Sequence, residues 1–177
     1  MSESIPSGRI EGIVNPAPKM PMNSFRASMY THFLIATDGS GFAQKGVEHG
    51  LALASRIKAK VTFLNVTEPF PMFDWESPMA GYSAGARFTL YQEEGRRFAM
   101  RILDQCKAEA HGAGVDAKAL HVENRKPGEA ILEWSKAEGC DLVVMASHGR
   151  RGLARLLLGS QATEVLSLST VPVLIIR

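Results

Sequence analysis

Several protein classes are excluded by what this sequence lacks. Only two of its 177 residues are cysteines, Cys106 and Cys140, and their spacing fits neither a metal site nor a redox motif. We therefore expect two reduced thiols rather than a disulfide. No apolar run approaches the roughly 20 residues that a membrane-spanning helix needs, and the amino terminus lacks the compact apolar core of a signal peptide. These absences favour a cytoplasmic protein that makes no membrane contact.

The sequence has little net charge and lacks two common phosphate-binding motifs. The 20 basic and 18 acidic side chains give a formal net charge of +2, which is too even to predict a nucleic-acid partner. The chain has no GxxxxGK motif followed by Ser or Thr, which argues against a P-loop NTPase, and no GxGxxG motif of a dinucleotide-binding fold. Its five histidines show no ligand spacing such as HExxH, so we expect no zinc centre.

Composition divides the chain near residue 30. Residues 1–29 hold four prolines and many small polar residues without periodicity, which is typical of a disordered leader, whether natural or added in cloning. Residues 30–177 alternate apolar runs with helical patterns and are expected to form one domain. Strands are predicted over 32–37, 61–66, 115–122, 141–146 and 171–176, and helices after 41, over 86–112, from 127 and over 160–169. A long loop is predicted over 68–85, and helical spacing places Trp134, Val165 and Leu166 on inner faces.

The alternation of strands and helices predicts the fold class. The strands are continuous apolar runs, which indicates an α/β fold: a single doubly wound, five-stranded parallel sheet, Rossmann-like, with helices on both faces. In the common strand order 3-2-1-4-5, ligands bind beyond the carboxyl ends of the first and fourth strands, where the order reverses. The segments at that point are Thr37-Asp38-Gly39-Ser40 and Met145-Ala146-Ser147-His148-Gly149.

The loop after the fourth strand combines glycines with basic residues. Gly149 and Gly159 allow backbone N–H groups to approach an anion, and the helix expected from Ser160 adds unpaired donors. Arg150 supplies positive charge beside them. The same residues also form an ordinary helix start with a solvated basic face, so that composition alone leaves both interpretations open.

The spacing within this loop resembles the nucleotide-binding pattern of the universal stress protein family. That pattern is Gly, two residues, Gly, nine residues, and then Gly followed by Ser or Thr. Here Gly149, Gly159 and Ser160 match it, and Ala146 stands where the family has its first glycine. The segments FLIATDGS, FLNVTEP and SQATEVLSLSTVPVLIIR resemble further parts of the family in the right order, so that the similarity covers about residues 30–177.

The resemblance implies a ligand, a pocket and an oligomeric state. Some members of the family bind ATP or AMP, and most are homodimers paired through the last strand, here from Val171 to Ile176. An apolar strand at a sheet edge also needs a partner on physical grounds. By position in the motifs, the pocket would hold Thr37, Asp38, Ser40, Val66, Met145, Ala146, Gly149, Gly159, Ser160 and Gln161. We add Arg150 on grounds of charge.

Three side chains have competing interpretations. Asp38 either contacts the nucleotide, where it can hold a water on Mg²⁺, or stabilises its own turn; its position at a strand end favours the pocket. His148 is expected to pack near the nucleotide rather than to shuttle protons. Ser40 lacks the GxSxG context of a hydrolase nucleophile. We predict no catalytic residue and no resident metal.

The sequence thus predicts a nucleotide-binding stress-response module, compatible with slow ATP hydrolysis. The alternative is a dimeric stress protein that acts through protein contacts without bound nucleotide, and Ala146 is the residue that keeps this alternative open. An ATP-dependent kinase or phosphotransferase ranks last, because the chain shows no second substrate domain and no acidic metal cluster.

Overall fold

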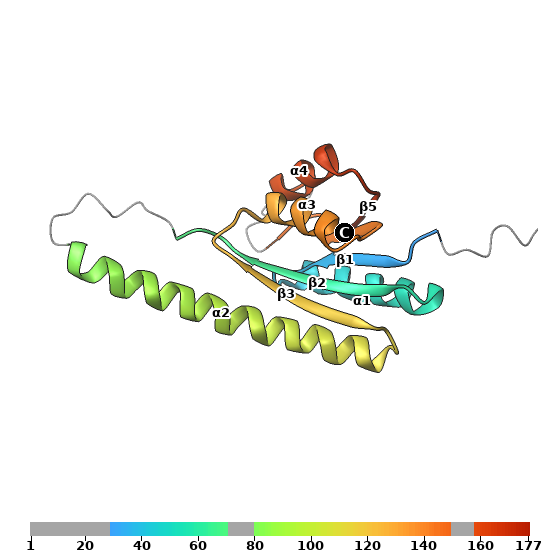
Figure 1. The fold of residues 1–177 in the computed structure, drawn as a ribbon, viewed down its shortest axis with the longest axis horizontal. Helices are drawn as coiled ribbons and strands as arrows, with labels where there is room; N and C mark the ends of the chain where they lie inside the picture. The colour runs from blue at the N-terminus through green and yellow to red at the C-terminus, as the bar shows by residue number, and fades with distance from the viewer. Residues whose placement is uncertain (1–28, 71–79, 150–157) are drawn as a thin grey trace, which may run out of the picture.

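Five parallel strands form one open sheet with helices on both faces (Figure 1). The computed structural model describes residues 29–70, 80–149 and 158–177. Along the chain the elements are β1 (His32–Ala36), α1 (Gly41–Ile57), β2 (Lys60–Thr67), α2 (Ala80–Gly112), β3 (Ala117–Glu123), α3 (Pro127–Ala137), β4 (Leu142–Ala146), α4 (Ser160–Leu168) and β5 (Val173–Ile176). The strands pair in the order β3-β2-β1-β4-β5, which confirms the predicted topology.

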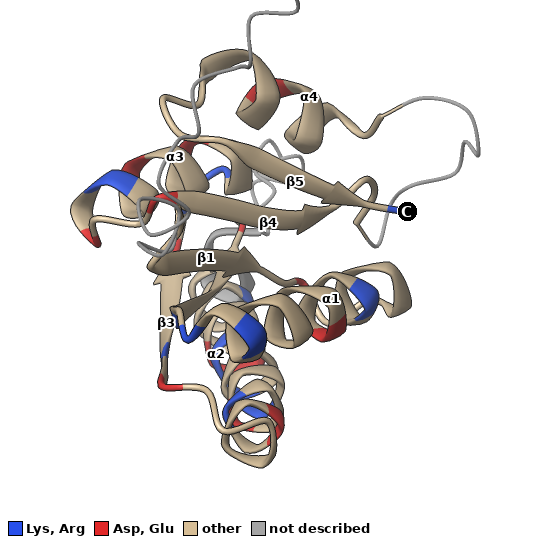
Figure 2. Ribbon diagram, turned by 90° about the vertical axis from the view of Figure 1, so that its right-hand side faces the viewer, with Lys and Arg blue, Asp and Glu red and all other residues tan. Residues whose placement is uncertain are grey.

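Strand β1 shows why the strands are continuous apolar runs. It lies at the centre of the sheet, and Phe33, Leu34 and Ile35 are each 0% exposed although successive side chains point to opposite faces. Helices therefore cover both faces, and a polar side chain in the strand needs a hydrogen-bond partner, as His32 has in Thr62. Figure 2 shows β1, β4 and β5 without charged residues, whereas charges are frequent on the helices.

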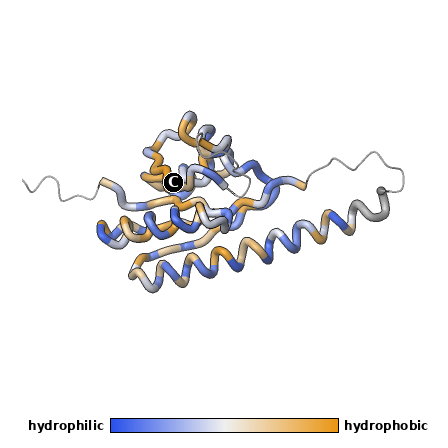
Figure 3. Tube along the Cα trace, turned by 180° about the vertical axis from the view of Figure 1, so that it is seen from behind, coloured by the Kyte–Doolittle hydropathy of each residue, from blue (hydrophilic) through white to orange (hydrophobic). Residues whose placement is uncertain are grey.

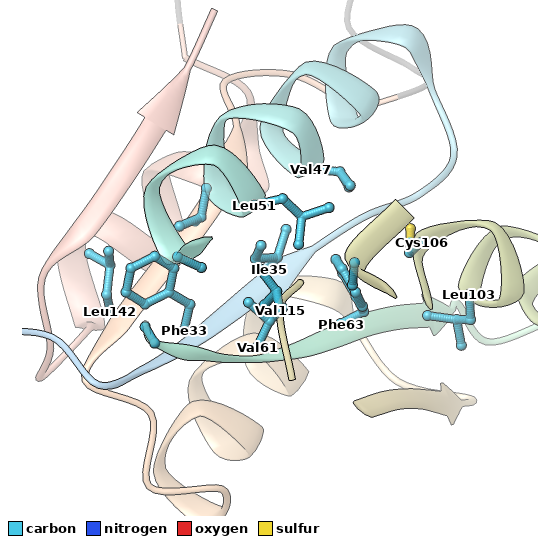
Figure 4. Packing of buried hydrophobic residues seen from close by; sticks show 14 residues of the cluster. Phe33, Ile35, Val47, Leu51, Val61, Phe63, Leu103, Cys106, Val115 and Leu142 are labelled. Carbon is cyan, nitrogen blue, oxygen red and sulfur yellow. The ribbon is translucent and has the colours of Figure 1, made fainter. Parts of the chain in front are cut away.

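Two apolar clusters hold the layers together. One lies between the sheet and the helices α1 and α2, where Ile35 and Phe63 cluster with Leu51 of α1 and Leu103 of α2 (Figure 4). The other lies beneath α3 and α4, with Val165 of α4 fully buried in it. Each fully buried side chain of this size contributes about 1.5–3 kcal/mol, so that these two clusters dominate the stability of the domain.

Helix α1 is fixed at both ends and lies close to the sheet. Ser40 is its N-cap, and the Oγ atom accepts a hydrogen bond from the N–H of Ala43 at 3.1 Å, an interaction worth about 1 kcal/mol. The helix ends at Lys58, which adopts a left-handed conformation with φ of 60°. On its buried face, a β-carbon at Gly46 would lie 3.5 Å from the backbone nitrogen of Ala146 in β4.

The second helix is longer than predicted. It begins at Ala80 rather than at Ala86, so the prediction of a loop over 68–85 is wrong in its last part. Gly81 and Gly85 indicated a loop, but each glycine costs a helix only about 1 kcal/mol relative to alanine, which the remaining turns offset. In Figures 1 and 3 the amino-terminal part of α2 extends past the sheet.

Of two further predicted inner positions, one is confirmed and the other is wrong. Trp134 is half-buried and packs against the apolar cluster beneath α3 and α4, as predicted, and the neighbouring Ser135 is also buried, with its hydroxyl donating to the carbonyl of Leu132. Leu166 is 41% exposed, so its predicted place in the core is wrong. The buried face of α4 is set by Ala162 and Val165, which are three residues apart and lie on one side of the helix.

Candidate functional site

Three loops and one helix start meet at the carboxyl edge of the sheet. Strand β1 lies between β2 and β4, so that the carboxyl ends of all three are neighbours. Thr37, Asp38 and Ser40 follow β1, Val66 lies near the end of β2, Met145, Ala146 and Gly149 lie at the end of β4, and Gly159, Ser160 and Gln161 begin α4. Arg150, which was added for its charge, lies outside the described residues.

The loop after β1 is held by its own polar groups and by β2. The carbonyl of Thr37 accepts a hydrogen bond from Nδ2 of Asn65 at 2.8 Å, and Thr37 Oγ1 accepts one from the N–H of Gly39 at 3.3 Å. One carboxylate oxygen of Asp38, Oδ1, accepts a hydrogen bond from the N–H of Ser40 at 2.9 Å. The turn interpretation of Asp38 is therefore correct for Oδ1, while Oδ2 points toward the loop after β4.

The two glycines of the motif lie where neighbouring backbones approach closely. A β-carbon at Gly149 would lie 2.8 Å from Oδ2 of Asp38, and one at Gly159 would lie 3.1 Å from the carbonyl oxygen of Ser147. Neither glycine has a positive φ, so the requirement is for space rather than for an unusual backbone conformation. A side chain at Gly149 would displace the Asp38 carboxylate, and one at Gly159 would press on the backbone at Ser147.

Ser147 connects this edge to the rest of the sheet. It is 3% exposed, and its N–H donates to the carbonyl of Ile176 in β5 at 2.8 Å. Its own carbonyl accepts the N–H of Gly159 at 2.9 Å, which joins the end of β4 to the start of α4. Its Oγ lies 3.1 Å from Nδ1 of His148. The two ends of the segment between residues 148 and 158 are therefore held together at Ser147.

Ala146 fits its position without strain. It is the last residue of β4, is 8% exposed and pairs with Ile176 of β5. The non-glycine residues of positive φ in the described chain are Lys58 and Asn124, so position 146 does not need the conformational freedom of glycine. The departure from the family pattern is thus compatible with the local backbone.

The start of α4 offers donors to an anion. Gly159 is the N-cap and has no side-chain oxygen to accept the N–H groups of the first turn, and this turn contains no acidic residue. Ser160 is exposed at the first position. The side chain of Gln161 is used elsewhere, because its Oε1 accepts the N–H of Gly128 at 2.6 Å and so joins α4 to α3. At this edge Gln161 has its backbone N–H to offer.

Val66 and Met145 supply apolar side chains near the ends of β2 and β4. Both belong to the apolar cluster under α3 and α4, and Met145 is 6% exposed. They can give a ligand an apolar floor and backbone groups. Among the described residues, no three His, Cys, Asp or Glu side chains gather in a way that would hold a metal ion.

Sequence reasoning missed Asn65 and Ser147 as supports of this edge. Asn65 is 2% exposed and is a polar residue between the apolar Leu64 and Val66 of β2. That contrast was a detectable signal, because buried polar groups need hydrogen-bond partners. Ser147 lay within the segment singled out, but its partners in α4 and β5 are visible only in the folded chain.

Similarity to known proteins extends over the whole described domain. The family model described as "Universal stress protein family" matches residues 29–177. Universal stress protein YxiE of Bacillus subtilis is 30% identical over 149 residues, which covers 84% of this chain and all of that protein. The solved structure of MJ0577 of Methanocaldococcus jannaschii superposes with a TM-score of 0.68 at 26% identity, over 84% of this chain and 96% of that one.

A further solved structure is of a universal stress protein in complex with cAMP. It superposes with a TM-score of 0.63 at 25% identity, over 85% of this chain and 99% of that one. The sequence match, the fold and the strand order thus agree with one another. On this evidence the chain belongs to the universal stress protein family.

Proposed function

We propose that this chain binds an adenine nucleotide, ATP or AMP, at the edge formed by the loops after β1, β2 and β4. The proposal depends most on Gly149 and Gly159, which let neighbouring loops meet with no side chain between them. The N–H groups at the start of α4 then remain accessible to phosphate. The relative in complex with cAMP supports an adenine nucleotide as the ligand class.

Each part of the edge has a role in this proposal. Phosphate oxygens would accept from the N–H groups of Ser160 and Gln161 and from the Ser160 hydroxyl. Val66 and Met145 would line the side of the base and ribose. With ATP, Mg²⁺ would neutralise phosphate charge, and Asp38 would hold one of its waters. We expect ATP turnover to be slow, because the roles assigned to these residues are binding roles.

A second candidate function is a dimeric stress protein that acts through protein contacts without nucleotide. Ala146 in place of the family's first glycine is the observation behind it. The ordinary backbone conformation at this position weighs against it. We therefore keep nucleotide binding as the first proposal.

We further propose a homodimer through the carboxyl-terminal strand. Within the described chain β5 pairs with β4 on one side and its other edge is open, and Val173–Ile176 are half-buried there. An apolar sheet edge is stabilised by pairing with a second strand. The functional unit would be residues 30–177 in the cytoplasm, after a leader of residues 1–29. No helix in the described ranges is apolar over enough length to cross a membrane.

Nucleotide extraction tests the first proposal. The protein is purified without added nucleotide and denatured, and the supernatant is separated by anion exchange; we expect ATP or AMP to elute. Emptied protein should show a thermal shift with millimolar Mg·ATP or with AMP, and Gly159→Val should abolish that shift. An empty preparation that shows no shift would overturn the proposal, and a full shift in Gly159→Val would place the ligand elsewhere.

A further inference from the structure

His148 is held in a defined position between two elements of the candidate site. Its Nδ1 lies 3.1 Å from Oγ of the buried Ser147. The ring also packs beside Phe42 in the first turn of α1, with 6.3 Å between ring centroids and a tilt of 52°. The side chain is half-buried. Contacts from both sides therefore restrict the rotation of the imidazole.

The opposite edge of the ring faces the start of α4. The ring atom Cδ2 would lie 3.8 Å from a β-carbon at Gly159, the N-cap of that helix. Because Nε2 is bonded to Cδ2, Nε2 also lies near the amino end of α4. Nδ1 is occupied by Ser147, so that Nε2 is the nitrogen available to a ligand.

We propose that Nε2 of His148 donates a hydrogen bond to a phosphate oxygen and thereby makes this site prefer phosphorylated adenosine over adenosine itself. This inference rests on the proposed nucleotide function. A phosphate oxygen can only accept, so the bound ligand selects the tautomer that carries its proton on Nε2. In that tautomer Nδ1 accepts the hydroxyl proton of Ser147. Ser147 is then the positioning residue, and His148 contacts the ligand.

The proposal assigns a role to His148, a position that the family's nucleotide-binding pattern leaves unspecified. In that pattern the residue before Gly149 is one of two unspecified positions. Backbone N–H groups at the start of α4 can bind an anion whatever the side chains there are. A fixed imidazole N–H adds a directional contact beside them. The contact is with phosphate rather than with base or ribose. Its loss should therefore change the affinity for nucleotides and not the affinity for adenosine.

Two substitutions of similar size separate the roles of the ring nitrogens. The amide nitrogen of glutamine reaches about where Nε2 lies, and that of asparagine reaches about where Nδ1 lies. Dissociation constants for ATP, AMP and adenosine are measured by calorimetry on wild-type protein, His148→Gln and His148→Asn. We expect His148→Asn to weaken ATP and AMP binding about tenfold, the effect of losing one hydrogen bond to a charged acceptor. His148→Gln should retain most of the affinity, and adenosine binding should be equal in all three.

The outcomes distinguish this inference from the function on which it rests. If wild-type protein binds none of the three compounds, the proposed nucleotide function fails and the role of His148 fails with it. If wild-type protein binds ATP and His148→Asn binds it equally well, only the role of His148 is overturned. A parallel loss for ATP and adenosine would also overturn it, because such a loss indicates a structural effect. Unchanged melting temperatures in both variants confirm that the comparison is between folded proteins.

Discussion

Gly149 lies so close to Asp38 that a β-carbon at position 149 would stand 2.8 Å from the Oδ2 atom of that carboxylate. The two residues come from loops more than a hundred positions apart, after β1 and after β4. Their close approach brings the loop after β1 next to the loop after β4, at the point where the strand order reverses. Gly149 thus has a tertiary role in addition to its place in a sequence motif.

Substitution of Gly149 by alanine should weaken nucleotide binding more than it weakens the fold. The new methyl group must displace the Asp38 carboxylate or the loop itself, because 2.8 Å is shorter than a normal carbon–oxygen contact. We expect at least a tenfold rise in the dissociation constant for ATP, measured by calorimetry. Gly85→Ala in α2 is the matched control, since nothing lies within 4 Å of its β-carbon position. That control should keep full affinity and gain up to about 1 kcal/mol of stability; equal affinities in the two variants would contradict the steric role.

Asn65 should support both stability and the nucleotide site. Asn65→Leu removes the donor that holds the carbonyl of Thr37, and we expect a loss of about 1–3 kcal/mol in the free energy of unfolding, measured in urea. Because Thr37 belongs to the candidate pocket, nucleotide affinity should fall as well. Thr62→Val is the control: this residue is 0% exposed in the same strand, but its hydroxyl contacts His32 near the opposite edge. Thr62→Val should lower stability and leave affinity unchanged, and a loss of affinity in both would argue against a specific role of Asn65.

Charges placed beside β5 should weaken self-association. Leu166 and Leu168 of α4 are 41% and 62% exposed, and α4 packs next to β5. If β5 pairs with a second copy, we expect these leucines to lie at or near the interface, so that Leu166→Lys with Leu168→Lys should shift the protein toward monomer in sedimentation experiments. Met100→Lys, an exposed position on α2, is the control and should leave the oligomeric state unchanged. A dimer that survives the double lysine variant would move the interface away from this edge.

The stability of the fold should decrease as the pH falls below about 6.5. Burial lowers the pKa of His32, with Lys60 and Lys118 acting in the same direction, and burial also lowers the pKa of His121. The unfolded chain then binds protons at a higher pH than the folded chain does, so the unfolded state gains as the pH drops. Urea denaturation at pH of about 7.5 and about 5.5 measures the difference. His32→Gln should reduce the slope, and a stability that rises on acidification would contradict these shifts.

Asp141 should add a second loss of stability at still lower pH. Burial acts to raise the pKa of this carboxylate, but the hydrogen bonds donated by the backbone of His32 and by the hydroxyl and backbone of Thr31 outweigh burial and lower the pKa. A depressed folded pKa stabilises the protein above the unfolded value of 3.8, and this contribution is lost as the pH falls through the folded pKa. The same urea denaturation series, extended to lower pH, should show that Asp141→Asn lacks this acidic loss of unfolding free energy.

The two thiols should be unreactive in the folded protein. Burial raises the pKa of Cys106 to about 12, and burial together with Glu138 and Asp141 raises that of Cys140 to about 11. Because the thiolate is the reactive form, a maleimide should label neither residue at neutral pH until denaturant is added. Ala52→Cys, at an exposed position of α1, should be labelled at once. Rapid labelling of the native wild-type chain would show that one of these positions opens readily.

The fold class could be predicted because apolar strands that alternate with helices are local signals, and the strand order is the common one for such a sheet; the candidate site stays a prediction. Continuous apolar strands indicate a covered parallel sheet, and its ligand edge is fixed by topology. The predicted start of α2 was wrong because Gly81 and Gly85 resemble loop residues, whereas the cost of each, about 1 kcal/mol, is offset by the remaining turns of this long helix. The inward place of Leu166 was wrong because one residue along a helix turns the side chain by about 100°. The supports at Asn65 and Ser147 depend on partners distant in sequence, which no local pattern reveals.

The hydrogen bond from Gly159 to Ser147 separates the chemistry of this edge from the integrity of the sheet. Because that bond ties the end of β4 to the start of α4, the free-energy cost of closing the chain between them depends only weakly on the number of residues there; doubling a loop costs about 0.6 kcal/mol. We therefore expect changes of sequence in the segment between residues 148 and 158 to alter ligand binding far more than the stability of the scaffold.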